Sequence, residues 1–70
     1  MRNIECLRRK AGLTQKEVSK AVGVTQGSVS QWENGASFPR ADKLPLLATI
    51  FGCTIDELYD DVRAAMREGA

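Results

Sequence analysis

Apolar residues recur at helical spacing at the start of the chain. Ile4, Leu7 and Ala11 fall on one stripe of a first helix, and Gly12 follows as a C-terminal stop signal. The alternating apolar and polar pattern of a half-buried strand is absent from the chain. These first residues therefore predict a short amphipathic helix that ends at Gly12.

A second helical stripe lies near residue 50. Its apolar positions follow the i, i+3, i+4, i+7 pattern, and they are Leu44, Leu47, Ala48 and Phe51, followed by Gly52. A proline is tolerated in the first turn of a helix but not in its interior. Because of Pro45, we expect this helix to begin near Asp42 or Lys43.

One helix-start signal occurs three times. A threonine follows an apolar residue, and a glutamate or serine comes three positions later, directly before a second apolar residue. The copies are Leu13-Thr14-x-x-Glu17-Val18, Val24-Thr25-x-x-Ser28-Val29 and Cys53-Thr54-x-x-Glu57-Leu58. The threonine oxygen accepts from a backbone N–H of the first turn, and the apolar pair packs across the helix entry. Three further helices are therefore predicted to begin at about residues 15, 26 and 55.

Together these signals predict an all-α protein, a bundle of five short helices. Asn34-Gly35 is typical of a hairpin turn, but no strand pattern flanks it, so we interpret Gly35 as the end of a helix. A chain of 70 residues allows one domain. We assign residues 1–70 to this single domain, with a helical C-terminal extension at about 60–68.

The second and third helices form a candidate DNA-binding unit. They are predicted at about 15–22 and 26–34, and the turn Gly23-Val24-Thr25 joins them. Two helices joined by a short turn that contains glycine are the helix-turn-helix signature, whose second helix enters the major groove of DNA. Their apolar side chains are expected to converge in one core, and these are Val18, Val22, Val24, Val29 and Trp32.

The outer face of the helix at 26–34 is polar and uncharged. If Val29 and Trp32 face inward, the exposed residues that could contact base edges are Gln26, Gly27, Ser28 and Gln31. A glutamine amide has one donor and one acceptor side, and it pairs with adenine N6 and N7 together. The alternative is an ordinary solvated helix face, which each glutamine taken singly favours. The spacing, the turn and the threonine caps together favour base reading.

Charge is unevenly distributed along the chain. Residues 1–40 carry seven basic and three acidic groups, whereas residues 41–70 carry three basic and six acidic groups. A basic first half suggests contact with a polyanion, although a solvated charged face is an equal alternative on charge alone.

Several classes of function lack the residues they need. The chain has no histidine, and its two cysteines, Cys6 and Cys53, are expected to be free thiols. No metal site, cofactor site or catalytic constellation is predicted, so we expect a protein that is not an enzyme. No apolar run is long enough to span a membrane or to form a signal peptide, which predicts a cytoplasmic location.

The segments "LRRKAGLTQKEVSKAVGVTQGSVSQWENG" and "FPRADKLPLLATIFGCTIDEL" together resemble the phage-repressor and Cro-type helix-turn-helix family, also called the Xre family. The resemblance covers roughly residues 4–59. It implies a compact five-helix bundle of the lambda-repressor-like DNA-binding type, encoded by a prokaryotic cell or a phage. It also implies binding to double-stranded operator DNA by a dimer, on two half-sites.

The resemblance also implies roles for particular residues. Gln26, Gly27, Ser28 and Gln31 would contact bases, and Gln15 would brace Gln26. Phosphates would be contacted by Gln15, Thr25, Ser30, Asn34, Arg40 and Lys43. Arg8 would form a structural ion pair with Glu33, and a semi-buried arginine needs such a carboxylate partner in any case. Ala36 and Ser37 stand where many members carry a basic residue, which weakens the phosphate contact there.

The C-terminal stretch at 54–68 continues an apolar stripe beyond what a small core needs. Tyr59, Val62 and Met66 are therefore candidate dimer contacts. The alternative is that these last turns cover the core or fray.

Two functions from different classes remain at this stage. The first is a sequence-specific DNA-binding transcriptional regulator, a repressor that acts as a dimer. The second is an antitoxin or protein-interaction adaptor on the same fold, with a toxin or anti-repressor as its protein partner.

Overall fold

The computed structural model describes residues 1–60, without the side chain of Arg2. This part of the chain contains five short α-helices joined by turns and loops. The α-helices are α1 (Arg2–Lys10), α2 (Gln15–Val22), α3 (Gln26–Asn34), α4 (Leu44–Phe51) and α5 (Ile55–Leu58), and a 3-10 turn, η1 (Ala41–Lys43), precedes α4. None of these residues lies in a strand. The predicted all-α class is therefore confirmed.

The three threonine start signals are confirmed as helix caps. Thr14 and Thr54 each accept a hydrogen bond from the backbone N–H of a glutamate three residues later, whose side chain bonds back to the threonine N–H. Thr25 accepts from the backbone N–H of Ser28 in the same way, without the return bond. The sequence thus places the starts of α2, α3 and α5 correctly.

Two predicted helix boundaries differ from the structure. The helix that contains Pro45 begins at Leu44, and residues 41–43 form η1 in place of its first turn. The first helix ends at Lys10, and Ala11 is an exposed C-cap, so Ala11 does not join the buried stripe. The chain turns at Gly12, whose φ of 73° is left-handed and favours glycine, so the helix cannot carry Ala11 onto the core.

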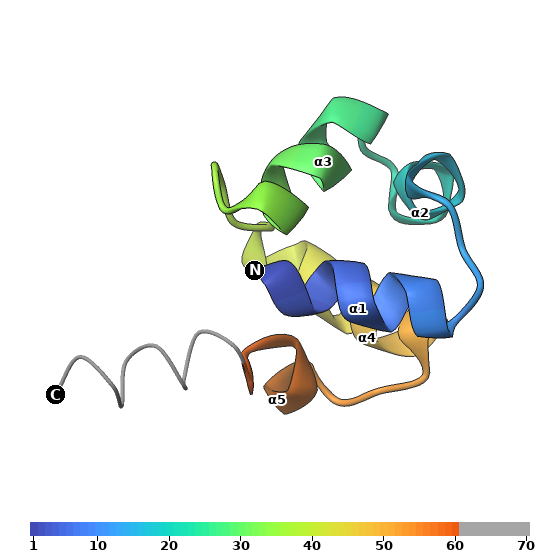
Figure 1. Ribbon diagram of the computed structural model, residues 1–70, viewed down its shortest axis with the longest axis vertical. Helices are drawn as coiled ribbons and strands as arrows, with labels where there is room; N and C mark the ends of the chain where they lie inside the picture. The colour runs from blue at the N-terminus through green and yellow to red at the C-terminus, as the bar shows by residue number, and fades with distance from the viewer. Residues whose placement is uncertain (61–70) are drawn as a thin grey trace, which may run out of the picture.

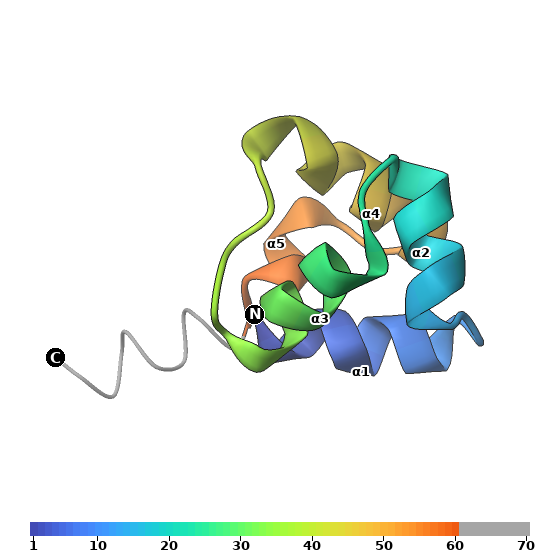
Figure 2. The ribbon, with the colours of Figure 1, turned by 90° about the horizontal axis from the view of Figure 1, so that it is seen from above.

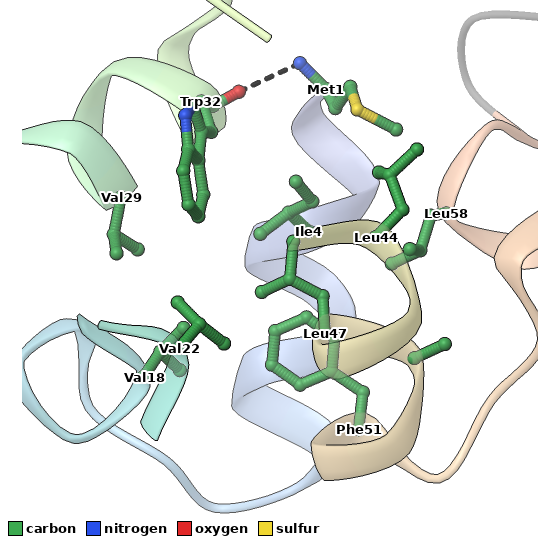
Figure 3. Close-up of a cluster of buried hydrophobic side chains, with 11 residues drawn as sticks. Met1, Ile4, Val18, Val22, Val29, Trp32, Leu44, Leu47, Phe51 and Leu58 are labelled. Carbon is green, nitrogen blue, oxygen red and sulfur yellow. Dashed lines mark hydrogen bonds between the residues drawn. The ribbon is translucent and has the colours of Figure 1, made fainter. Parts of the chain in front are cut away.

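The core lies where all five α-helices meet. Figure 3 shows side chains from α1, α2, α3, α4 and α5 converging on one cluster. Its buried residues are Met1, Ile4, Val18, Val22, Val29, Trp32, Leu44, Leu47, Ala48, Phe51 and Leu58. The ammonium group of Met1 donates to the carbonyl oxygen of Trp32 at 2.8 Å and links the start of α1 to the last turn of α3.

The helices are arranged so that α2 and α3 form one side of the molecule. In Figure 1 these two helices lie on one side of α1 and α4, and α5 lies on the other. The loop between α3 and η1 runs along the left side of the coloured ribbon in Figure 2, from the end of α3 to η1. The outer side of α2 and α3 therefore faces away from α1, α4 and α5.

The predicted C-terminal extension lies mostly outside the described residues, as do the dimer candidates Val62 and Met66. Tyr59, the third candidate, is half-buried and packs against the core cluster. Leu58 is fully buried, so α5 closes the core on its side. Within residues 1–60, no helix has the length and apolar character needed to cross a membrane.

Candidate nucleic-acid interface

The unit formed by α2 and α3 has the geometry of a helix-turn-helix. Gly23 ends α2 in the left-handed conformation, with φ 74° and ψ 38°, and this allows the sharp turn. The N–H of Val24 donates to the carbonyl oxygen of Ser19 at 2.9 Å and closes the turn. Val18, Val22 and Val29 are buried and hold α2 against α3. The predicted turn at 23–25 therefore joins the two helices as expected.

Helix α3 is turned with its apolar side toward the core. Val29 is fully buried, and Trp32 and Glu33 each retain 5% of their exposure. Gln26, Gly27 and Gln31 are exposed. The sequence expectation that tryptophan faces inward is confirmed, and both glutamines lie on the solvent side of α3.

At the first turn of α3, some polar side chains form hydrogen bonds within the protein and one does not. The hydroxyl oxygen of Thr25 accepts from the backbone N–H of Ser28 at 3.1 Å and lies 3.0 Å from the hydroxyl oxygen of Ser28. The hydroxyls of Thr25 and Ser28 therefore form a hydrogen bond with each other, and Thr25 also caps the helix. Gln26 makes no side-chain hydrogen bond within residues 1–60, so its amide is available to a partner molecule.

Gly27 is not required by the fold. A Cβ atom at this position would contact only the hydroxyl oxygen of Thr25, at an ordinary 3.8 Å, and the backbone is not left-handed there. Glycine is a poor residue for a helix, so a packing reason would normally accompany it. No such packing reason is present among the described residues.

The last turn of α3 is tied to the loop that follows it. The backbone carbonyl of Gln31 accepts from the N–H groups of Ala36 and Ser37 at 3.0 and 3.3 Å. The side-chain carbonyl of Asn34 accepts from the same Ala36 N–H at 2.9 Å, and this bond does not use the amide N–H groups of Asn34. The hydroxyl of Ser37 donates to the side-chain carbonyl of Gln31 at 3.5 Å.

Glu33 joins three segments of the chain below α3. Its carboxylate accepts from Arg8 Nε at 2.6 Å and from Arg8 Nη2 at 3.2 Å, and the two side chains are only 5% and 11% exposed. Arg8 Nη1 also donates to the carbonyl oxygen of Leu13 at 2.9 Å. The hydrogen bond to Glu33 raises the pKa of Arg8, so the guanidinium stays charged.

Gln15 belongs to the same network. Its Nε2 donates to Glu33 Oε1 at 3.0 Å, and Gln26 makes no side-chain hydrogen bond in the described chain. The expected brace from Gln15 to Gln26 is therefore wrong for this structure. A buried carboxylate is a stronger acceptor than a neutral amide, which explains why Gln15 turns toward Glu33. One N–H of the Gln15 amide is left for a phosphate.

The two basic phosphate candidates differ in their surroundings. Arg40 is 85% exposed in its side chain and lies 3.6 Å from Asp42, a weak surface contact. Lys43 is half-buried, and its Nζ would lie 3.9 Å from a Cβ atom built on Gly23. The Lys43 ammonium is thus beside the C-terminus of α2, where the helix dipole favours a cation.

Two further features of residues 1–60 bear on function, the metal-ligating side chains and the cysteines. Residues 1–60 contain no group of three or more His, Cys, Asp or Glu side chains able to hold a metal ion. Cys6 is exposed and Cys53 is half-buried, and both are free thiols. Burial and the carboxylate of Glu57 raise the pKa of the Cys53 thiol, so it is neutral at physiological pH.

Three hydrogen bonds around α3 and α2 give no signal in the sequence. They are the bond from Gln15 to Glu33, the bond from Ser37 to Gln31 and the link from Met1 to Trp32. Ser37 was considered only as a lost basic residue. Ser37 lies six positions after Gln31, and Gly35 ends α3 between the two residues. This spacing therefore carries no helical or capping signal.

The chain has recognisable relatives. A family model described as "Helix-turn-helix" matches residues 5–58. The chain is similar to "HTH-type transcriptional activator BcrR" of Enterococcus faecalis, with 33% identity over 55 residues, 79% of this chain and 27% of that protein. It is also similar to the "26 kDa repressor protein" of Escherichia phage HK022, with 39% identity over 54 residues, 71% of this chain and 23% of that protein.

The similarity is confined to one region of each relative. The chain spans about a quarter of the length of these curated relatives, 27% and 23% respectively. No solved structure matches the chain at a significant level.

Proposed function

The chain belongs to the helix-turn-helix family and is of its phage-repressor, or Xre, type, and on this premise we propose that it is a sequence-specific DNA-binding transcriptional regulator. In this proposal α3 lies in the major groove and the N-terminus of α2 lies against the phosphate backbone. A dimer engages two half-sites about one helical turn, ~34 Å, apart.

The orientation of α3 carries the proposal. Trp32 is buried at 5% exposure, while Gln26 and Gln31 are exposed. The amide of Gln26 has no intramolecular hydrogen-bond partner in the described chain. A surface that offers neutral donors and acceptors on a rigid helix suits base edges, because the phosphate contacts around it supply the long-range attraction.

The residues proposed to contact bases are Gln26, Gly27, Ser28 and Gln31. Gln26 and Gln31 supply amides, and Gly27 lets the backbone approach. Ser28 shares its hydroxyl with Thr25, so its main role is to hold the first turn of α3. Proposed phosphate contacts come from Gln15, Thr25, Ser30, Asn34, Arg40 and Lys43.

The dimer is proposed from the sequence of the C-terminal stretch. Tyr59, Val62 and Met66 fall on one apolar stripe, and symmetric operators require two copies of the protein.

A substitution in this stripe tests the dimer. Val62→Asp is expected to weaken binding to a two-half-site operator at least tenfold and binding to a single half-site much less. Equal weakening on both DNAs would exclude this interface.

We also propose repression as the mode of regulation, because a small protein in the major groove of a promoter blocks access to it. The relatives are named both as an activator and as a repressor. A reporter gene behind the selected operator decides the sign, since repression lowers its expression when the protein is supplied.

The experiment that tests DNA binding is selection from a random duplex pool, followed by affinity measurements at two salt concentrations. We expect a selected motif and an affinity that falls steeply with salt. Gln26→Ala is expected to flatten the preference at one base pair of each half-site and to keep the melting temperature, because Gln26 is exposed and makes no intramolecular bond. An unchanged motif in this variant would exclude Gln26 as a base reader.

A second candidate is an antitoxin or adaptor that binds protein. Phe38, in the loop after α3, is 63% exposed, the largest exposure among the large apolar side chains of the described residues. Exposed aromatic residues are common in protein interfaces. Absence of any salt-sensitive binding to duplex DNA would favour this candidate over the regulator.

A further inference from the structure

The two exposed glutamines of α3 differ in how firmly they are held. Gln26 makes no side-chain hydrogen bond in residues 1–60. The side-chain carbonyl of Gln31 accepts a 3.5 Å hydrogen bond from the hydroxyl of Ser37. Within residues 1–60, one glutamine therefore lacks a side-chain hydrogen bond and the other has one to a neighbour outside α3.

The position of Ser37 is set by the backbone and not by its own side chain. Gly35 ends α3 in the left-handed conformation, with φ 84°, and turns the chain back along the helix. The N–H groups of Ala36 and Ser37 then donate to the backbone carbonyl of Gln31. Ser37 is half-buried as a result, and its hydroxyl is brought next to the Gln31 amide.

Restraint matters for reading a base because an amide has two distinguishable ends. A freely rotating glutamine can present its carbonyl or its NH2 group, and it fits several base pairs after paying an ordering cost. When one lone pair of the carbonyl accepts from a hydroxyl, rotation of the amide is restricted, and both N–H groups and the second lone pair favour one direction. Discrimination between bases rises with such preorganisation.

We infer that Ser37 is a specificity-determining positioning residue: it fixes the amide of Gln31, so that the base pair read by Gln31 is discriminated more strictly than the one read by Gln26. This inference rests on the proposed function, since it assumes that α3 reads DNA. Ser37 itself makes no base contact in this scheme and acts through Gln31. The uncharged loop residue thus has a role in place of the phosphate contact that a basic residue would make.

The test compares selected motifs and affinities for the wild type and for Gln31→Ala, Gln26→Ala, Ser37→Ala and Ser37→Thr. The two glutamine variants identify which base pair each side chain reads. Alanine at position 37 keeps the backbone N–H that bonds to Gln31, so the loop is retained and only the hydroxyl is lost. Threonine restores a hydroxyl at the same place, and thermal melting of each variant reports on the fold.

We expect Ser37→Ala to lower discrimination at the Gln31 base pair about three- to tenfold. Discrimination at the Gln26 base pair stays unchanged and serves as the internal control. Ser37→Thr restores the wild-type preference, and all variants melt near the wild-type temperature.

Three results would overturn the inference: an unchanged preference in Ser37→Ala, a uniform loss of preference at both base pairs, or no rescue by threonine. Failure of the proposed function itself looks different. In that case the wild-type protein selects no motif at all, before any variant is compared.

Discussion

At the residue scale, the buried carboxylate of Glu33 is tolerated in the core because it has hydrogen-bond partners. Glu33 is buried, and its carboxylate accepts from both Arg8 and Gln15. An unpaired buried charge would cost several kcal/mol, on the order of 3–5. The network thus links α3 to α1 through Arg8 and to α2 through Gln15.

Replacement of Trp32 by alanine tests the packing of α3. The side chain is 5% exposed, so Trp32→Ala leaves a cavity and is expected to lower the free energy of unfolding by about 3–5 kcal/mol in urea denaturation. Gln26→Ala on the opposite side of the same helix is the control, and its change is expected to stay within about 0.5 kcal/mol. Comparable losses in both variants would contradict the inward orientation of Trp32.

The thiol of Cys53 tests the electrostatics of the turn between α4 and α5. Burial and the nearby Glu57 carboxylate raise its pKa above the ordinary value of 9.0. The thiolate is the reactive form, so alkylation of Cys53 in a Cys6→Ser variant is expected to reach its half-maximal rate at a higher pH in the folded protein than in urea.

The same shift links folding to pH. A raised pKa in the folded state contributes stability that is complete below pH 9.0 and is lost as the pH rises through the folded value. The alkylation experiment decides whether the shift exists. If the pH of half-maximal alkylation of Cys53 is the same or lower in the folded protein than in urea, Glu57 and burial do not raise the pKa of this thiol.

At the element scale, local signals set where each helix begins and ends. The capping boxes at Thr14 and Thr54 and the left-handed glycines at 23, 35 and 52 lie at helix ends in the structure. These interactions span at most a few residues, so a sequence reveals them directly. The exceptions are the start of α4, where η1 replaces the expected first turn, and the end of α1, which lies at Lys10.

The cap of α2 is the sharpest test at this scale. Thr14 accepts from the N–H of Glu17 at 3.1 Å, and Glu17 Oε1 accepts from the N–H of Thr14 at 3.1 Å. Thr14→Ala is expected to lower the free energy of unfolding by about 1 kcal/mol, measured by urea denaturation. Thr14→Ser keeps the oxygen and is expected to retain most of that stability, so equal losses in the two variants would refute a capping role.

At the scale of the whole molecule, the distribution of charge should govern how the protein meets DNA. The basic excess lies in residues 1–40 and the acidic excess in residues 41–70. The helices α2 and α3 come from the basic half and together form one side of the fold (Figure 1). Most of the proposed DNA contacts therefore come from the basic half of the chain, with Lys43 as the exception. The helices α2 and α3 themselves carry two lysines and two glutamates, so the basic excess of that half lies mainly on α1 and at Arg40.

The salt dependence of DNA affinity tests this arrangement. Arg40 is 85% exposed and is a proposed phosphate contact, so Arg40→Ala is expected to reduce the slope of log affinity against log salt by about 1. Arg9 is the matched control, because it pairs with Glu5 at 2.7 Å on α1 and is 70% exposed. An equal change of slope in Arg9→Ala would show that Arg40 acts only through net charge.

The sequence alone determined the helices, their caps and the side of α3 that is buried. Periodicity and capping act over three or four residues, so Thr14, Trp32 and Gly35 reveal their roles without knowledge of the fold. The candidate base-reading surface followed from the same periodicity, because burying Val29 and Trp32 leaves Gln26 and Gln31 outside.

Only the tertiary structure decided how the polar side chains pair. Gln15 bonds to Glu33 across 18 positions, and Ser37 reaches Gln31 only because the chain reverses at Gly35. A glutamine or serine has several possible partners of similar strength, and the one it takes depends on which helices pack together. Apolar spacing says which face is buried but carries no information on such choices, and for that reason the restraint on Gln31 became visible only in the folded chain.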